Sequence, residues 1–179
     1  MRGEPRILVT GASGFAGRHL MRALVEAFPG YASWCHGGPR SRDLPPLDVT
    51  DANAADAAIA AARPDMIVHL AGQADVAAAG ADPEAAMRTN AGGTHTMIEA
   101  ALKHAPSALF LAISSSEVYG DSLAGGMPTP ETRPLLPASA YARSKAAAED
   151  AVRAGVARGL HALIARPFNH TGPGQSPAF

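Results

Sequence analysis

Tyr141 and Lys145, in the stretch SAYARSK (139–145), are the two side chains of this sequence whose types and spacing best suit proton transfer. Positions i and i+4 lie on one face of a helix, so both side chains can point into one site. An ammonium close to a phenol favours the phenolate, so we expect the pKa of Tyr141 to fall from its ordinary value toward neutrality. Since 13 of the 15 basic residues are arginines, composition alone predicts an arginine rather than a lysine at position 145.

Three glycines in TGASGFAG (10–17) point to a second kind of chemistry. They follow a short apolar run and open a helical pattern. In such a turn Gly11 allows the tight bend, Gly14 lets the backbone approach a pyrophosphate, and Gly17 permits close packing of the helix. A glycine-rich turn can be only a turn, but its position after the first strand predicts dinucleotide binding.

A cluster of hydroxyls and one carboxylate, SSSEVYG (114–120), follows a later apolar run. Ligands of open α/β sheets lie at the carboxyl ends of strands, so these side chains can reach the crevice of Tyr141. Serines at a strand end can equally be caps or turns.

The elements that must position these residues alternate regularly along the chain. Apolar runs predict strands at 6–10, 31–36, 65–72, 108–115 and 160–167, and helical patterns cover 14–28, 51–64, 82–104 and 140–158. Asp51 can cap the second helix, and Pro83 falls in the first turn of the third. The alternation predicts an α/β fold with a doubly wound parallel sheet, Rossmann-like, and a long loop after Glu117 that is typical of a functional segment.

Composition limits the classes of function. With 179 residues, 47% hydrophobic and 17% charged, residues 1–179 read as one globular domain. A net charge of −1 does not favour nucleic acid or an anionic membrane as partner. One cysteine, Cys35, provides neither a disulfide nor a metal cluster, and no signal or spanning segment stands out, so we expect a cytoplasmic protein without a metal.

The spacing G-x-x-G-x-x-G, and SSSEVYG followed by Y-x-x-x-K, resemble the extended short-chain dehydrogenase/reductases, the NAD-dependent epimerase/dehydratase family. The stretches VHLAGQADV (68–76), TNAGGT (89–94) and ARPFNHTGPGQ (165–175) are similar to the GDP-6-deoxy-4-keto-mannose reductases, and the position of Glu117 resembles GDP-mannose 4,6-dehydratase. The resemblance covers nearly the whole chain. Members of the family continue into a C-terminal part that grips the nucleotide and sugar, so we expect that part to be missing here and cofactor binding to exceed catalysis.

The resemblance implies a Ser–Tyr–Lys site. Ser115 would hydrogen-bond the developing oxyanion, Tyr141 would exchange a proton, and Lys145 would tune Tyr141 and anchor the ribose. Glu117 falls where the dehydratases carry a glutamate base, although it could equally bind a sugar hydroxyl. The implied reaction is reduction of the 4-keto group of a GDP-6-deoxyhexose; a nucleotide-sugar 4,6-dehydratase, a 4-epimerase and a non-catalytic dinucleotide-binding fragment stay open.

The motifs and the resemblance together imply two sets of binding residues. The cofactor-binding set is Gly11, Ser13, Gly14, Phe15, Gly17, Arg40, Asp48, Val49, Leu70, Ala71, Gly72, Tyr141, Lys145 and Pro167. The substrate-binding set is Gln73, Asn90, Ser116, Phe168 and Asn169.

The choice of cofactor depends on the loop after the second strand, where CHGGPRSR (35–42) offers two arginines and no acid. Arg40 and Arg42 can pair with a 2′-phosphate, which favours NADP, with NAD as the alternative. In the family, the helices at 82–104 and 140–158 commonly pair with their copies, so a homodimer is expected as well.

Overall fold

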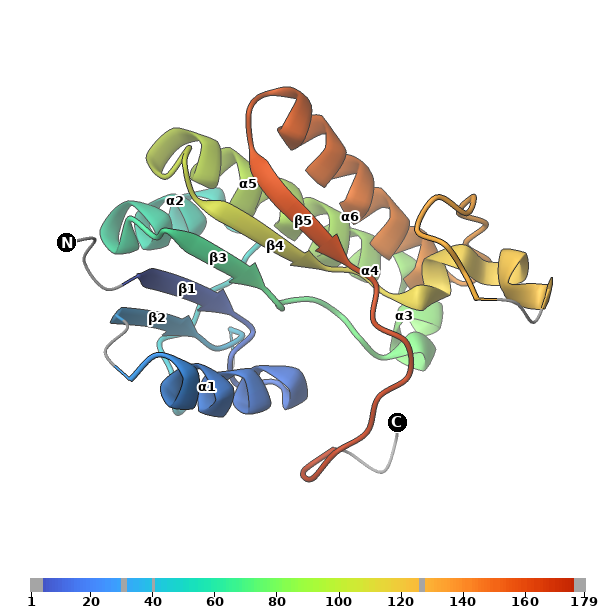
Figure 1. The fold of residues 1–179 in the computed structure, drawn as a ribbon, viewed down its shortest axis with the longest axis horizontal. Coiled ribbons are helices and arrows are strands. Elements are labelled where there is room, and N and C mark those ends of the chain that lie inside the picture. Colours follow the sequence, from blue (N-terminus) through green and yellow to red (C-terminus); the bar gives the residue numbers. More distant parts are fainter. Residues whose placement is uncertain (1–4, 30–31, 40, 126–127, 176–179) are drawn as a thin grey trace.

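The computed structural model describes residues 5–29, 32–39, 41–125 and 128–175. Its centre is one parallel sheet in the order β2-β1-β3-β4-β5 (Figure 1). The strands are β1 (Arg6–Thr10), β2 (Ala32–His36), β3 (Met66–His69), β4 (Leu109–Ile113) and β5 (His161–Ala165). The predicted doubly wound, Rossmann-like sheet is confirmed, with all five strands where the apolar runs place them.

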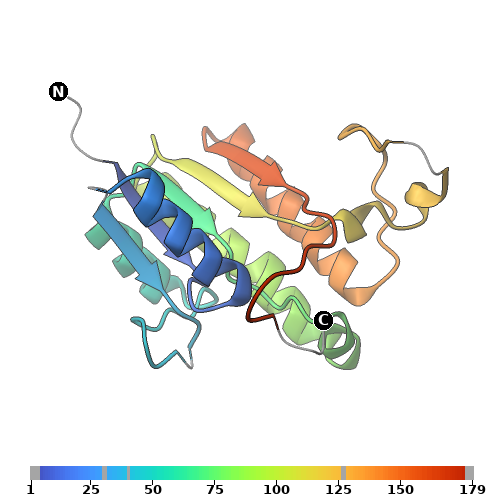
Figure 2. The ribbon, with the colours of Figure 1, turned by 60° about the horizontal axis from the view of Figure 1, so that its bottom comes forward.

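Helices cover both faces of this sheet, as Figures 1 and 2 show. They are α1 (Phe15–Ala27), α2 (Ala52–Ala62), α3 (Val76–Ala81), α4 (Pro83–Met87), α5 (Gly93–His104) and α6 (Ala140–Ala157). Alternate strand residues face opposite ways. Leu8, Ile67 and Phe110 pack in the cluster that also holds buried residues of α2, α5 and α6, while Val9 and Val68 pack with Leu24 of α1.

The helix ends follow the chemistry of their first residues. Asp51 caps α2 as predicted, because its carboxylate accepts from the Asn53 and Ala54 amides at 2.8 and 3.2 Å. Pro83 occupies the first turn of α4, and the Asp82 carboxylate accepts from the Ala85 amide at 2.9 Å. These caps set where each helix begins after the preceding loop.

Two segments differ from the predicted elements. The helix expected over 82–104 is interrupted by a π-helical turn, η1 (Arg88–Gly92), which joins α4 to α5. The long loop after β4 begins as a 3-10 segment, η2 (Ser116–Gly125), and α3 was not predicted. A π turn inserts an extra residue into a helix and is frequent at functional sites, and Asn90 lies within this one.

The two faces are covered unequally. α1 packs on strand residues of β1 and β3, while Leu163 of β5 is 58% exposed. Within the part of the chain that the structure describes, no helix combines the length and apolarity that a membrane crossing needs.

Candidate functional site

Tyr141 and Lys145 lie in the first turns of α6. The helix begins at a capped end, since the Ser139 hydroxyl accepts from the Ala142 amide at 2.9 Å. Both side chains are buried, at 8% and 9% exposure, and Lys145 Nζ donates to the Ile113 carbonyl at 2.9 Å. The start of α6 is therefore fastened to the carboxyl end of β4, the edge where an open α/β sheet binds ligands.

Ser115 and Glu117 meet Tyr141 at this edge. The side chains of Ser115 and Tyr141 interact by a hydrogen bond, and Ser115 Oγ accepts from the Glu117 amide at 3.2 Å. Glu117 is exposed, yet its charge acts on Tyr141. The structure thus brings together all four residues predicted to be catalytic; their roles stay predictions.

The expected direction of the Tyr141 pKa is wrong for this structure. Burial raises the pKa of the Tyr141 phenol; the bond from Ser115 opposes that rise and the Glu117 charge adds to it. Lys145 does not reverse the shift, because its ammonium is directed to the Ile113 carbonyl and burial lowers its own pKa to about 8. The phenol of Tyr141 accordingly holds its proton at neutral pH.

Asn90 connects the loop after β3 to α6. Its Oδ1 accepts from the Gln73 amide at 2.8 Å, and its Nδ2 donates to the Gln73 carbonyl at 3.1 Å and to Ser144 Oγ at 2.8 Å. Ser144 in turn donates to the Tyr141 carbonyl at 2.7 Å. Asn90, a predicted substrate-binding residue, is thus two hydrogen bonds from the Tyr141 carbonyl, and Gln73, another, is three hydrogen bonds from it.

The glycine turn has the conformation that its sequence requires. Gly11 has φ 70°, and a Cβ there would lie 2.7 Å from the Ala71 amide nitrogen. A Cβ at Gly17 would lie 2.4 Å from the Gly11 carbonyl oxygen, so α1 packs directly on the turn. The first turn of α1 contains no acidic residue, which leaves its amides and the positive end of its dipole suited to an anion.

The other predicted cofactor residues surround this turn. Leu70 and Ala71 lie against Gly11, with Gly72 following, and a Cβ at Gly37 would lie 3.1 Å from Ser13 Oγ, so the loop after β2 reaches the turn. Arg42 is exposed in that loop, whereas Arg40 lies outside the described residues. Asp48 is exposed and Val49 buried.

The segment after β5 crosses toward α1, as Figures 1 and 2 show. The Pro167 carbonyl accepts from the Ser116 amide at 3.0 Å, which places both residues beside Ser115. Phe168 is 56% exposed and Asn169 is exposed. His170 stacks on Phe15 of the glycine motif, with ring centroids 6.1 Å apart.

The sequence analysis missed Thr10 and His69, which are paired at the last positions of β1 and β3. Thr10 Oγ1 accepts from the Ala71 amide at 3.2 Å and is hydrogen-bonded to His69 Nδ1, 2.8 Å away. His69 Nε2 is buried and has no hydrogen-bond partner among the described residues. Their register as neighbouring strand ends was the signal that could have found them.

Four more polar residues behind the site were not singled out. They are Ser144, Glu149, Arg166 and Tyr119, all joined to site elements by hydrogen bonds. Glu149 could have been found from its spacing, because it lies one helical turn after Lys145 and two turns after Tyr141.

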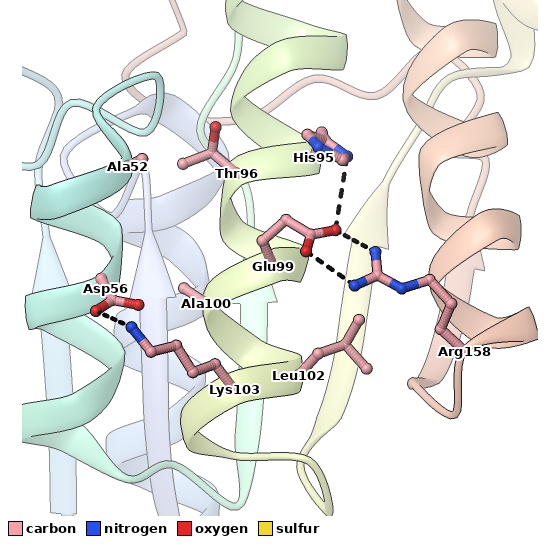
Figure 3. A pocket seen from close by; sticks show the side chains of 9 residues that line it. All are labelled: Ala52, Asp56, His95, Thr96, Glu99, Ala100, Leu102, Lys103 and Arg158. Atoms are coloured by element: carbon pink, nitrogen blue, oxygen red, sulfur yellow. Dashed lines mark hydrogen bonds and ion pairs between the residues drawn. The ribbon is translucent and has the colours of Figure 1, made fainter.

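A groove of about 500 Å³ lies elsewhere, between α2, α5 and the end of α6 (Figure 3). Its walls carry the Lys103–Asp56 pair at 2.8 Å and the Arg158–Glu99 pair. The lining residues, all within the described part of the chain, include none of the predicted site residues. The described ranges also contain no group of His, Cys, Asp and Glu side chains arranged to hold a metal ion.

Comparison with known proteins adds the family. The sequence model of the NAD dependent epimerase/dehydratase family matches residues 7–179. The chain is similar to a GDP-6-deoxy-D-mannose reductase of Pseudomonas aeruginosa, with 38% identity over 97% of this chain and 55% of that protein. It is also similar to a dTDP-glucose 4,6-dehydratase of Mycolicibacterium smegmatis, with 34% identity over 95% of this chain and 55% of that protein.

A solved structure agrees with the sequence relatives. RMD from Pseudomonas aeruginosa, complexed with NADPH, superposes with a TM-score of 0.83 and 36% identity, over 98% of this chain and 56% of that one. The chain therefore spans a little over half the length of the proteins that it matches.

The burial of His69 predicts a pH dependence of stability. Burial, and the nearby Lys145 charge, lower the pKa of His69 from 6.5 to about 3 in the folded chain. Between these values the unfolded chain binds a proton that the folded chain does not, so stability falls as the pH falls. The loss amounts to at most about 1.4 kcal/mol per pH unit.

We expect His69→Asn to flatten the dependence of the unfolding free energy on pH between about pH 6 and 4, measured by urea denaturation. The variant His161→Asn, at an exposed position of β5, is the matched control. An unchanged slope in His69→Asn would contradict a buried neutral His69.

Proposed function

Because this chain belongs to the NAD dependent epimerase/dehydratase family, we propose that it carries the dinucleotide-binding and proton-transfer parts of a nucleotide-sugar oxidoreductase. The observation that carries the proposal is the contact of the Ser115 hydroxyl with the Tyr141 oxygen, one helical turn from the buried Lys145. This contact lies at the sheet edge that also holds the glycine turn.

The residues present fit a dinucleotide. Gly11 keeps the turn free of side chains, and the first turn of α1, without an acidic residue, offers its amides to a pyrophosphate. When bound, the nicotinamide supplies or accepts a hydride.

The chain's own residues would handle the proton. In the reducing direction the C4 carbonyl carbon of the sugar gains a hydride and its oxygen takes the proton of Tyr141, giving a 4-hydroxy sugar. Ser115 would donate a hydrogen bond to the same oxygen while charge develops on it. The raised pKa of Tyr141 suits this direction, because a phenol that keeps its proton at neutral pH can donate it.

We place reduction of a GDP-linked 4-keto-6-deoxyhexose first, because the reductase relative is 38% identical. Glu117 supports a second candidate, a nucleotide-sugar 4,6-dehydratase. Its exposed carboxylate acts on Tyr141 and could remove a proton next to a 4-keto group. The dehydratase relative, at 34% identity, is nearly as similar.

We favour NADP over NAD. The loop after β2 reaches the glycine turn at Ser13, and it carries the exposed Arg42. A guanidinium there can pair with a 2′-phosphate, and the RMD structure that this chain resembles is complexed with NADPH.

We also propose a homodimer in the cytoplasm. The helices that commonly pair in the family correspond to α4–α5 and α6, and Met87 of α4 and Val156 of α6 are 40% and 49% exposed. The single Cys35 suits a reducing compartment.

Tyr141→Phe tests the proton transfer. We expect the wild-type chain to oxidise NADPH with a GDP-4-keto-6-deoxyhexose, and the variant to be slower by about 100-fold or more, the usual range for a general acid. The rate is followed at the nicotinamide absorbance, and NADPH binding, followed by fluorescence, should change little. Equal rates in the two proteins would refute the assignment.

Arg42→Ala tests the cofactor preference. Loss of a charge-assisted hydrogen bond should weaken NADPH binding by about 10-fold or more and leave NADH binding unchanged, as measured by nicotinamide fluorescence. Arg22→Ala, an exposed arginine of α1, is the control. Equal loss for both dinucleotides would contradict recognition of the 2′-phosphate by Arg42.

The oligomeric state tests the helix pairing. Light scattering during size exclusion should give twice the chain mass of 18.3 kDa, and Val156→Asp on α6 should shift it toward the monomer. Val25→Asp on α1, at a similarly exposed valine, should not. A strictly monomeric wild type at high concentration would rule out the dimer.

A further inference from the structure

Glu149 is a buried carboxylate directly behind the catalytic residues. Its side chain is 1% exposed, and both oxygens are fully engaged. Oε1 accepts from Ser114 Oγ at 2.6 Å and from Arg166 Nε at 2.8 Å. Oε2 accepts from Arg166 Nη2 and from Arg153 Nη2, both at 2.7 Å. Burial alone would raise the pKa of Glu149, but the bonds from Arg166 and Ser114 outweigh it, so the pKa is lowered and the carboxylate stays charged.

Arg166 continues the network beyond Glu149. Its guanidinium binds the carboxylate through two nitrogens, and Nη1 donates to the Tyr119 hydroxyl at 2.8 Å and to the Glu131 carbonyl at 3.0 Å. The guanidinium also lies 5.0 Å from the centroid of the Tyr119 ring. One side chain thus joins the end of β5 to η2 and to the segment that follows η2.

The backbone around Ser115 is held by the same strand end. The Ser114 amide donates to the Ala165 carbonyl at 2.8 Å, and the Ser116 amide donates to the Pro167 carbonyl at 3.0 Å. Arg166 lies between these two acceptors. Ser115 therefore lies between two residues, Ser114 and Ser116, whose amides are hydrogen-bonded to the residues before and after Arg166. We call residues 114–116 the Ser115 segment.

Glu149 connects the Ser115 segment to α6, the helix that carries Tyr141. It lies on α6, one turn after Lys145 and two turns after Tyr141, so its position and that of the phenol are set by one rigid element. Its hydrogen bond from Ser114 and its two hydrogen bonds from Arg166 attach the Ser115 segment to that helix. Along this route, Glu149 and Arg166 link the helix that carries Tyr141 to both chain neighbours of Ser115.

We propose that Glu149 and Arg166 act as a clamp that sets the position of the Ser115 hydroxyl against the Tyr141 oxygen. They are positioning residues that touch neither reacting group and work through Ser114 and the end of β5. The catalytic consequence rests on the function proposed above, but the geometric claim does not.

A role of Glu149 and Arg166 in positioning the Ser115 hydroxyl can be distinguished from a role in the stability of the fold alone. Replacing a buried ion pair by apolar residues is often neutral, whereas removing one partner leaves an uncompensated charge. Both roles therefore predict that variants of Glu149 are less stable. Only the positioning role predicts that a folded variant has a changed environment at the Tyr141 oxygen.

The test is the 13C resonance of the Tyr141 ring carbon that bears the hydroxyl, observed with labelled tyrosine at neutral pH and assigned with Tyr141→Phe. Ser115→Ala should shift this resonance by removing the hydrogen bond to the phenol. Glu149→Gln should shift it in the same direction by at least half as much. In the double variant the shift should not exceed that of Ser115→Ala, because Glu149 acts through Ser115.

Three further variants complete the design. Glu99→Gln is the matched control, since Glu99 also pairs with an arginine, Arg158, far from Ser115. Arg153→Ala removes the more exposed partner of Glu149, 47% exposed, and should leave the resonance unchanged. Ser114→Ala removes the hydroxyl that donates to Glu149 and should also shift the resonance. It therefore tests the clamp if Glu149→Gln does not fold.

The outcomes separate the two proposals. A resonance unchanged in Ser114→Ala, or in folded Glu149→Gln, overturns the clamp whether or not the chain turns over sugar. If Tyr141→Phe leaves NADPH oxidation unaffected, the proposed function fails while the resonance still decides the clamp. If both proposals hold, Glu149→Gln lowers kcat by about 10-fold or more with NADPH binding unchanged, as expected for a misplaced catalytic group.

Discussion

The buried ammonium of Lys145 is the constraint on which the arrangement of the site depends. A charge at 9% exposure needs a polar partner, and the Ile113 carbonyl at the end of β4 provides one. This bond fixes the start of α6 against the sheet edge. Tyr141, one turn earlier, is thereby placed beside the residues that follow β4. Among these residues, Ser115 forms a side-chain hydrogen bond with Tyr141.

Two further polar connections fix the position of α6 against the carboxyl ends of the strands, one on each side of the Lys145 bond. On one side Asn90, in the π-helical turn, joins the loop after β3 to Ser144 of α6. On the other side Glu149 joins α6 to the ends of β4 and β5. Buried polar networks of this kind contribute little net stability relative to an apolar core, so their main physical effect is to specify one geometry.

The sequence predicted the elements well because strands, caps and glycine turns depend on local residue types. Asp51 and Pro83 act on their own helix ends, and Gly11 is required by its own backbone. The π-helical turn and the bonds of Glu149 depend on contacts between segments far apart in the chain, which local patterns do not encode. The direction of the Tyr141 pKa was wrong for the same reason: spacing placed the lysine correctly, but not the carbonyl to which its ammonium is directed.

The electrostatics of the site follow from which buried groups keep their charge. Glu149 and Arg166 neutralise each other, and burial keeps His69 uncharged at neutral pH, with the Lys145 charge acting in the same direction. Lys145, with its pKa lowered to about 8, stays mostly protonated at pH 7 and is the remaining buried cation among these groups. Together with the uncapped positive end of α1, it gives this edge of the sheet a field that favours an anionic ligand, although the net charge of the chain is −1. The attraction for a phosphate-bearing molecule is therefore a local property of the strand ends and not of the overall composition.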